Sequence, residues 1–532
     1  MSTKTKKSTD NTHKLNRRAI CLRAPLALII LLAIFLVPQR SASTKEPPQD
    51  PAKEETEMIA PNVEVLKGQA IMRFVDADPN QLKTFILVTG RRDPRMYAID
   101  LQKALRPENN NTPNAIVSRS KVALDRLDGQ PLGDSANVVI SEDEKTAYVV
   151  NHHGSIDNAE FLQHGGRGNI AVMNVKKMVK RQHDNTADAL EQHIDSGHFG
   201  SVGLVLFRDL FIIGNAESHL TEDGGNRITF VDRKTGSLRG QVELALGAGV
   251  PAFPCPMFPV PFVSPSGPPA FEHPFAQANG AFSPVPLLSP HAAWGCFPDT
   301  NGLALGRGSD GKFYLFAANG GTDDVSVIDL ERALAGQKTP EIMRIPTQIG
   351  PWGIAASPDR RFIVAANRES QRVPFEGNTI SIIDVDRARE GNPNAELRRV
   401  LVGANSPDVQ TRPFIPSFTP SGREIIVPNF RTNNVSIVDL NLALSGHPNP
   451  EVARIPLVRP ADPDGVVRAA RPKGSAVTSD GRYAVISGGA RTTFEPSGTV
   501  WIIDLRKRAV IATVTGVGND PYGLALVESE DD

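Results

Sequence analysis

Residues Phe313 to Leu330 read FYLFAANGGTDDVSVIDL, two apolar runs separated by a polar stretch that begins with Asn319. In the second run, the order Val325-Ser326-Val327-Ile328 alternates apolar and polar side chains. This alternation is typical of a β-strand whose two faces are differently solvated. The stretch therefore predicts a β-hairpin that ends in Asp-Leu.

The same unit recurs along the chain, which is the signature of a repeat architecture. Clear copies cover Phe362 to Val385, Glu424 to Leu440 and Tyr483 to Leu505, and more divergent ones cover Phe85 to Leu101, Tyr148 to Val175 and Phe211 to Asp232. Several copies follow a further apolar strand, at 302–305, 353–356, 415–419 and 475–478. Three evident strands and an outer one make a four-stranded blade, so we predict an all-β, seven-bladed β-propeller over residues 61–532.

The end of the chain has the sequence of a first strand of a blade. Because an eighth blade would leave an open edge, we expect Tyr522 to Val527 to complete blade one and close the ring.

These units resemble the YVTN-type (YncE-like) β-propeller repeat, in which an apolar strand ending in Asn is followed by Val-Ser-Val-Ile-Asp. The closing segment, Val510 to Val514 followed by Gly518 to Leu526, is similar to the linker strand and next first strand of that family. The resemblance implies the fold but no single activity, since proteins with this repeat include envelope binding proteins, lactonase-like enzymes and propeller domains of copper- or quinone-linked redox enzymes.

The first 43 residues resemble an export signal. Basic residues precede an apolar run from Ala24 to Val37, and Ser41-Ala42-Ser43 offers small residues for cleavage. We interpret 1–43 as a signal peptide and 44–60 as a disordered spacer, which gives a periplasmic or secreted protein. An uncleaved anchor is the alternative, and the pair Arg17-Arg18 resembles that of a twin-arginine export signal.

Two cysteines, Cys255 and Cys296, remain after the leader, and export favours a disulfide between them over a two-thiol metal site. They bracket a proline-rich insertion at 247–298, which is predicted to be either an ordered lid over the channel or a loop packed on the blade surface. The balance of 58 Lys plus Arg against 59 Asp plus Glu gives no global field to attract nucleic acid.

Five histidines are expected on the face that carries the loops between second and third strands and the loops that enter the next blade. Neutral imidazoles beside a carboxylate suit copper or zinc, so a metal site is one hypothesis. Solvated or turn-capping histidines are the alternative, because no pair has the spacing of a known metal motif. These residues are His152, His153, His164, His198 and His219.

The same face is expected to carry several arginines from blades five to seven. Their forked guanidinium groups suit a carboxylate or phosphate ligand. The alternative is surface charge paired with Glu369, Glu376 and Glu495. The arginines are Arg368, Arg412, Arg431 and Arg491.

Three kinds of function fit these features. The first is an exported binding protein, a monomer or a subunit of a complex, that presents its channel-mouth face to a protein or envelope polymer. The second is a copper- or zinc-dependent enzyme or lactonase-like hydrolase at that mouth. The third is a docking subunit of a redox complex. The sequence contains no CxxCH, GxSxG or Walker motif that would decide among them.

Overall fold

The computed structural model describes residues 82–91, 95–122, 135–152, 167–179, 189–216, 225–244, 298–369, 376–462, 465–489 and 498–530. The predicted signal peptide (1–43), the spacer (44–60), Cys255, Cys296 and all of the insertion except Pro298 lie outside these residues.

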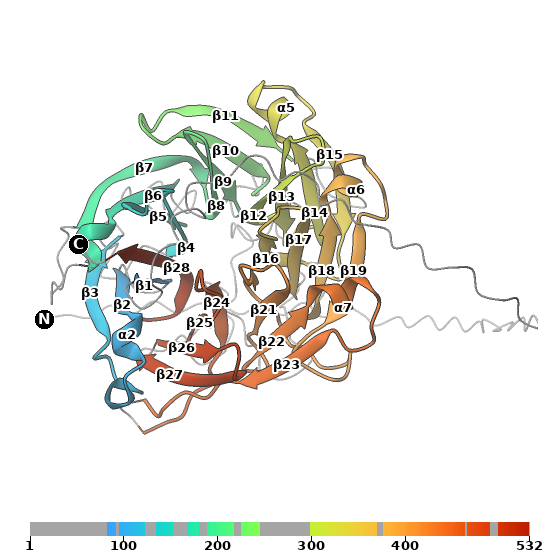
Figure 1. Cartoon of the computed structure of the whole chain (residues 1–532). Helices are drawn as coiled ribbons and strands as arrows, with labels where there is room; N and C mark the ends of the chain where they lie inside the picture. Colours follow the sequence, from blue (N-terminus) through green and yellow to red (C-terminus); the bar gives the residue numbers. More distant parts are fainter. Residues whose placement is uncertain are drawn as a thin grey trace, which may run out of the picture. The chain divides into compact units, whose positions relative to one another are not determined.

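Seven four-stranded antiparallel sheets follow one another around a ring, as predicted (Figure 1). The first strand of each blade contacts the first strands of both neighbouring blades, so the seven first strands form the inner circle. Blade one contains β28 (Pro521–Glu530), β1 (Leu82–Gly90), β2 (Arg95–Asp100) and β3 (Ile116–Lys121); blade two β4 (Ser135–Ile140), β5 (Thr146–Asn151), β6 (Arg167–Asn174) and β7 (Leu190–Phe199); blade three β8 (Ser201–Phe207), β9 (Leu210–Asn215), β10 (Arg227–Asp232) and β11 (Leu238–Glu243).

The remaining blades have the same order. Blade four contains β12 (Thr300–Arg307), β13 (Phe313–Asn319), β14 (Asp324–Asp329) and β15 (Glu341–Pro346); blade five β16 (Pro351–Ala356), β17 (Phe362–Glu369), β18 (Glu376–Asp384) and β19 (Glu396–Leu401); blade six β20 (Ser417–Phe418), β21 (Glu424–Asn429), β22 (Asn434–Asp439) and β23 (Glu451–Pro456); blade seven β24 (Pro472–Val477), β25 (Tyr483–Gly488), β26 (Thr499–Asp504) and β27 (Ala509–Thr515).

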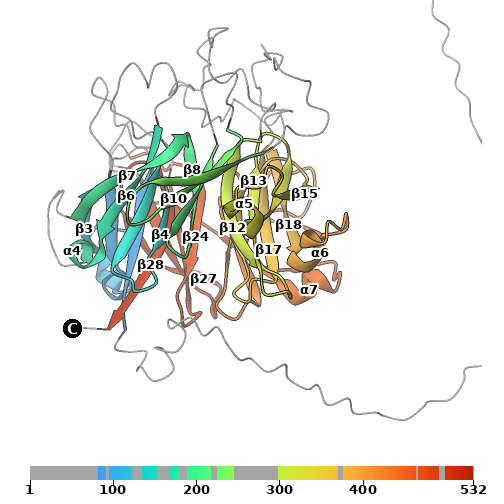
Figure 2. The ribbon, with the colours of Figure 1, turned by 90° about the horizontal axis from the view of Figure 1, so that it is seen from above.

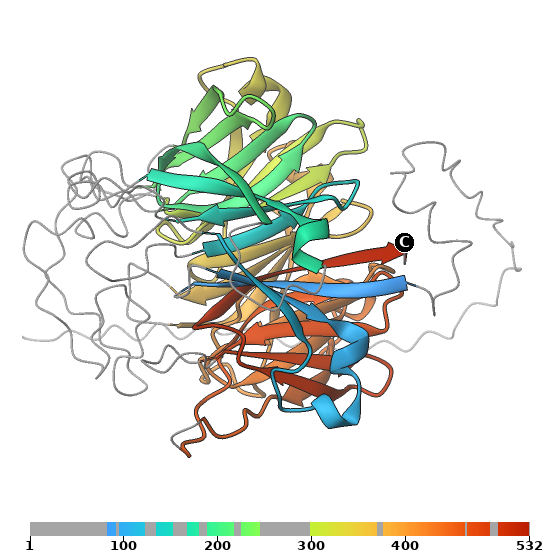
Figure 3. The same cartoon turned by 90° about the vertical axis from the view of Figure 1, so that its left-hand side faces the viewer.

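The ring is closed by the last strand of the chain. Strand β28 pairs antiparallel with β1, and their register includes Phe85 opposite Val527 and Val88 opposite Leu524. Figure 3 shows the red C-terminal strand beside the blue β1. The predicted closure is confirmed, and it joins segments more than 400 residues apart in the sequence.

The asparagine of the repeat is a buried polar connector in blades two to six. In blade four, Asn319 donates to Asp324 Oδ1 and to Ser326 Oγ, both at 2.7 Å, and accepts from Thr300 Oγ1 at 3.3 Å. A side-chain amide thus joins the first three strands at one end of the blade and satisfies polar groups that burial would otherwise leave unpaired. Asn215, Asn367 and Asn429 form similar bonds to the third strand or first strand.

The terminal aspartate of the repeat caps a short helix. Asp329, Asp384 and Asp439 each accept a hydrogen bond from the backbone N–H three residues later, which is the usual N-cap geometry. The helices lie at the outer edge of the ring (Figures 1 and 2). Among the described residues they are α2 (Leu101–Ala104), α4 (Val175–Val179), α5 (Leu330–Leu334), α6 (Val385–Arg389) and α7 (Leu440–Leu444), and a 3-10 turn, η1, spans Pro107–Asn109. No helix among the described residues is long and apolar enough to cross a membrane.

Blades pack on one another through apolar faces. One buried cluster, for example, joins Phe316 and Val327 of blade four to Ile363 and Ile383 of blade five. Because each blade shares such clusters with its neighbours, no blade buries both of its faces alone.

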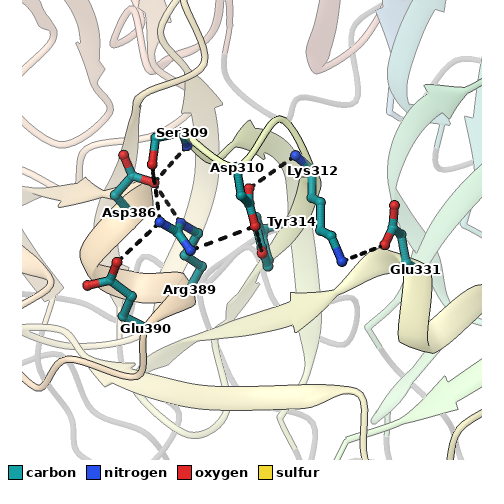
Figure 4. Close-up of polar contacts among 8 residues, drawn as sticks. All are labelled: Ser309, Asp310, Lys312, Tyr314, Glu331, Asp386, Arg389 and Glu390. Carbon is teal, nitrogen blue, oxygen red and sulfur yellow. Dashed lines mark hydrogen bonds and ion pairs between the residues drawn. The ribbon is translucent and has the colours of Figure 1, made fainter.

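A polar contact joins blades four and five on the face opposite the channel mouth (Figure 4). The Asp386 carboxylate accepts hydrogen bonds from Ser309 N at 2.8 Å and from Arg389 Nε at 2.7 Å. Tyr314 donates its hydroxyl hydrogen to Asp310 Oδ2 at 2.7 Å. Burial raises the pKa of Tyr314 to about 12, with help from that hydrogen bond to Asp310.

We expect this tyrosine to make the protein lose stability in alkali. Its raised pKa means that the folded protein keeps the hydroxyl proton after the unfolded chain has lost it. The contribution is complete below about pH 10, the ordinary pKa of tyrosine, and is lost as the pH rises towards about 12. Urea unfolding of the wild type and Tyr314→Phe at pH 8 and pH 11 will measure it. The stability advantage of the wild type should shrink at pH 11, and an unchanged difference would contradict the assignment.

Candidate functional site at the channel mouth

One residue per blade occupies an equivalent position at the start of the first strand. In each blade this residue comes directly after the one that pairs with the end of the second strand. In blade five, for example, Pro351 pairs with Asn367 and the residue in question is Trp352. Trp352 and Tyr522 come from blades five and one, which are not neighbours in the ring, yet Trp352 Nε1 donates to the Tyr522 hydroxyl. Side chains at this position therefore point toward the channel. The seven channel residues are Ala136, Val202, Asn301, Trp352, Phe414, Lys473 and Tyr522.

Glycine follows the channel residue in five blades because neighbouring first strands approach closely. A Cβ added to Gly302 would lie 2.5 Å from Trp352 O, and one added to Gly523 would lie 2.5 Å from Ala136 O. Real Cβ atoms do not come this close to a carbonyl oxygen. The tight inner circle brings the channel residues within reach of one another.

The channel residues are bulky on one side of the ring and small on the other. Trp352, Phe414 and Tyr522 form an aromatic group. The Phe414 ring centroid lies 6.4 Å from that of Trp352 and 5.4 Å from that of Tyr522. Blades two and three contribute only Ala136 and Val202. The mouth is therefore asymmetric, with aromatic and basic side chains in blades five, six, seven and one.

A buried ion network lies beside the aromatic group. Arg412 pairs with Glu369 at 2.6 Å and with Glu376 at 3.4 Å, and Arg368 pairs with Glu369 at 2.7 Å. The side chains of Arg368 and Arg412 are 3% and 1% exposed. Since each charge buried without a partner costs several kcal/mol, the two carboxylates are needed to keep these guanidinium groups in place.

Aromatic faces hold the same cations. The Arg368 guanidinium lies 4.2 Å from the Trp352 ring centroid and 4.7 Å from that of Phe414. Arg412 lies 4.8 Å from the centroid of Phe430. Such cation–π contacts are worth about 2 kcal/mol when they are shielded from water, so they add to the ion pairs.

A second layer of arginines is partly exposed. Arg431 is 25% exposed at its side chain and makes a two-point ion pair with Glu376, with Nε 2.7 Å from Oε2. Arg471 lies over Phe430 at 5.4 Å and Arg91 over Tyr522 at 5.6 Å. These three guanidinium groups contact Glu376, Phe430 and Tyr522, and their residues are partly exposed to solvent.

Lys473 and Asp520 form a buried pair in the channel wall. The Lys473 ammonium contacts Asp520 Oδ1, and it also lies 5.5 Å from the Phe430 ring centroid. The charged groups named so far at this part of the mouth are six basic side chains and three carboxylates: Arg91, Arg368, Arg412, Arg431, Arg471 and Lys473 with Glu369, Glu376 and Asp520. The local field is therefore positive, although the chain as a whole is nearly neutral.

Charged residues occupy left-handed backbone positions just before several first strands. The φ angles are 53° at Asp299, 54° at Arg412, 45° at Arg471 and 57° at Asp520. A residue with a Cβ pays about 1 kcal/mol or more for this conformation, and glycine would avoid the cost. The strain favours a role for these charged side chains at the mouth.

The structure places some of the predicted site residues and not others. Arg368, Arg412 and Arg431 come together and pair with Glu369 and Glu376. These are two of the carboxylates named in the alternative of paired surface charge, but Arg368 and Arg412 are buried and do not lie on the surface. His152 and His198 are buried at the same face of blade two, 2% and 7% exposed. His153, His164, His219, Arg491 and Glu495 lie outside the described residues.

No group of three or more His, Cys, Asp or Glu side chains suited to a metal ion occurs within the described ranges. The channel residues, Arg91 and Arg471 were not predicted from the sequence. A signal was present, because a bulky or polar residue followed by glycine recurs at the first strands, as in Asn301-Gly302, Trp352-Gly353, Lys473-Gly474 and Tyr522-Gly523.

Comparisons with known proteins describe the fold. No family model matches the chain, and no curated protein is similar to it in sequence. Among solved structures, a candidate 6-phosphogluconolactonase from Bacteroides fragilis is 13% identical, with a TM-score of 0.49, covering 85% of this chain and 100% of its own. The periplasmic gluconolactonase of Pseudomonas aeruginosa is 14% identical (TM-score 0.46, 84% and 100% covered), and the hydrazine synthase of Kuenenia stuttgartiensis is 16% identical (TM-score 0.42, 72% and 81% covered). At these identities and TM-scores, the matches assign no activity to this chain.

Proposed function

We propose that this protein is an exported binding propeller that holds an anionic group of a protein or envelope polymer at its channel mouth. The observation that carries the proposal is the two-layer arrangement of arginines. The buried Arg368 and Arg412 are fixed by Glu369 and Glu376, and the partly exposed Arg431 is oriented by the same Glu376.

This arrangement is preorganised for an anion. Guanidinium groups whose orientation is fixed by ion pairs and ring stacking lose little freedom when a carboxylate or phosphate binds. Arg431, Arg471 and Arg91 keep part of their surface in solvent, so a ligand can reach them without dismantling the buried layer. Export depends on the predicted leader at 1–43, which stays a prediction.

The test is a binding titration with poly-L-glutamate as the carboxylate probe and inorganic polyphosphate as the phosphate probe. We expect the double variant Arg431→Gln/Arg471→Gln to bind the preferred probe at least about tenfold more weakly, since two charge-assisted contacts are lost. Wild-type affinity should also fall as salt is raised.

The matched control is Arg423→Gln. Arg423 is an arginine of blade six on the opposite face, 70% exposed and paired with Asp439 at 3.2 Å. Its loss should leave binding unchanged. Equal weakening by both variants would show non-specific charge attraction, and no binding of either probe by the wild type would contradict the proposal.

A metal-dependent enzyme is the second candidate, and blade two provides the reason to keep it. His152 follows β5 and His198 lies near the end of β7. Both are at the same face of blade two, and strand β6 lies between β5 and β7. Strands this far apart in a sheet are separated by roughly 10 Å. Elemental analysis of protein purified without a chelator tests it: near-stoichiometric copper or zinc that is lost in His152→Ala/His198→Ala would favour this candidate, and absence of metal would remove it.

A further inference from the structure

Asn301 is the channel residue of blade four, and its amide oxygen is buried without a hydrogen-bond donor. The residue is fully buried in β12, and Nδ2 donates to Asp299 O at 2.9 Å. Oδ1 accepts no hydrogen bond. A buried acceptor left unpaired costs about 1–3 kcal/mol, so native proteins rarely keep one without a partner.

The geometry around Asn301 determines which way the oxygen faces. A Cβ at Gly320 would lie 2.8 Å from Asn301 Nδ2 and 3.2 Å from Asp299 Oδ2, so Gly320 packs against both side chains. The nitrogen of the amide therefore faces Gly320 and Asp299, and the oxygen faces the other way. By its register, Asn301 points to the channel as Trp352 does, between the small Val202 of blade three and Trp352 of blade five.

A carboxylate accompanies this acceptor. Asp299 Oδ2 lies 3.4 Å from Asn301 Nδ2, and Asp299 is 2% exposed. Asp299 also has a left-handed backbone, with φ of 53°, immediately before β12. An amide acceptor directed into the channel and a negative charge beside it attract a group that donates hydrogen bonds and is positively charged.

We propose that Asn301 and Asp299 form a subsite for a protonated primary amine, and that the ligand of the channel mouth is an amphoteric polypeptide segment. Its ammonium group binds at blade four, and its acidic groups bind at Arg431 and Arg471 of blades six and seven. The anionic half of this proposal rests on the proposed function, and the amine half rests on blade four alone. An ammonium group can donate a hydrogen bond to the Asn301 amide oxygen, and the negative charge of the Asp299 carboxylate, on the nitrogen side of the amide, attracts it at longer range.

The probes are tetraglutamate with a free amino terminus and the same peptide with an acetylated amino terminus. Four extended residues reach about 13 Å, which allows the two ends to contact different blades. By isothermal titration, we expect wild type to bind the free peptide at least about tenfold more tightly than the acetylated one. Asn301→Leu should abolish this preference and leave the affinity for the acetylated peptide unchanged.

Other variants separate the two halves of the proposal. Arg431→Gln/Arg471→Gln should weaken both peptides by the same factor and keep the preference for the free amine. Asn301→Leu removes one unpaired polar atom and one hydrogen bond, from Nδ2 to Asp299 O, so it should unfold near the wild-type temperature, and this checks that the variant is folded.

If wild type binds both peptides equally while the arginine variant weakens both, the amine subsite is wrong and the anionic site stands. If the preference persists in Asn301→Leu, a different residue reads the amine and the assignment is wrong. If neither peptide binds, the proposed function fails, and the amphoteric ligand fails with it.

Discussion

Gly523→Ala is expected to destabilise the ring by about 2–3 kcal/mol, although it adds only one methyl group. The new Cβ would lie 2.5 Å from Ala136 O and 3.1 Å from Asn137 Cα, both backbone atoms of blade two. Backbone cannot rotate away as a side chain can, so blades one and two must separate. Because blade one holds the closure between β28 and β1, the strain acts where the ring is joined. Urea unfolding followed by tryptophan fluorescence measures the effect.

Gly240→Ala is the matched control, since Gly240 lies on the outermost strand β11 and its added Cβ would meet only Phe230 Cδ2 at 3.8 Å. We expect Gly240→Ala to be neutral or stabilising by about 0.5 kcal/mol, because alanine restricts the unfolded chain. If both variants lose the same stability, close approach of the first strands is not what requires glycine at 523.

Most of the fold could be predicted because the repeat encodes local chemistry. Three features of the repeat each have one structural task. The alternation in the third strand sets its two faces, the asparagine that ends the second strand connects strands, and the aspartate that ends the third strand caps a helix. These tasks recur in blade after blade, so the sequence contains independent copies of the same information. Closure could be predicted because a strand without a partner is an edge.

The candidate site could be predicted only in part, because it is made of contacts between blades. The position of Arg368, Arg412 and Arg431 on one face follows from the repeat, since each lies at or near the end of a second strand or ahead of a first strand. Their burial depends on Glu369, Glu376 and the rings of Trp352, Phe414 and Phe430, which come from blades five and six. Repeat position alone does not specify which side chains meet across a channel.

The direct pairing of Trp352 with Tyr522 illustrates the limit. The two residues are separated by 170 positions and by two intervening blades. Their contact follows from the inner radius of the ring, which the glycines at 353 and 523 set by letting first strands approach. The sequence contained both residues and both glycines, but the distance across the channel is a property of the closed ring.

Glu376→Gln is expected to lower the free energy of unfolding by about 3–5 kcal/mol, the range found when one partner of a buried ion pair is removed. Glu376 is 5% exposed at its side chain and receives both Arg412 and Arg431. Glutamine keeps the size of the side chain and removes its charge. Glu369 is then the one remaining carboxylate partner of Arg412, whose side chain is 1% exposed. Because Arg368 also pairs with Glu369, a single carboxylate must balance two buried guanidinium groups. Urea unfolding at neutral pH is the measurement.

Glu396→Gln in the same blade is the control. Glu396 pairs with Arg399 at 2.6 Å, but the Arg399 side chain is 38% exposed, so water screens the pair and its loss should cost less than about 1 kcal/mol. A large effect at Glu376 with a small one at Glu396 would show that burial makes the channel-mouth network costly to break. Equal, small effects would mean that water reaches Arg412 in solution; the buried layer would then be unable to orient Arg431, and the preorganisation on which anion binding depends would be lost.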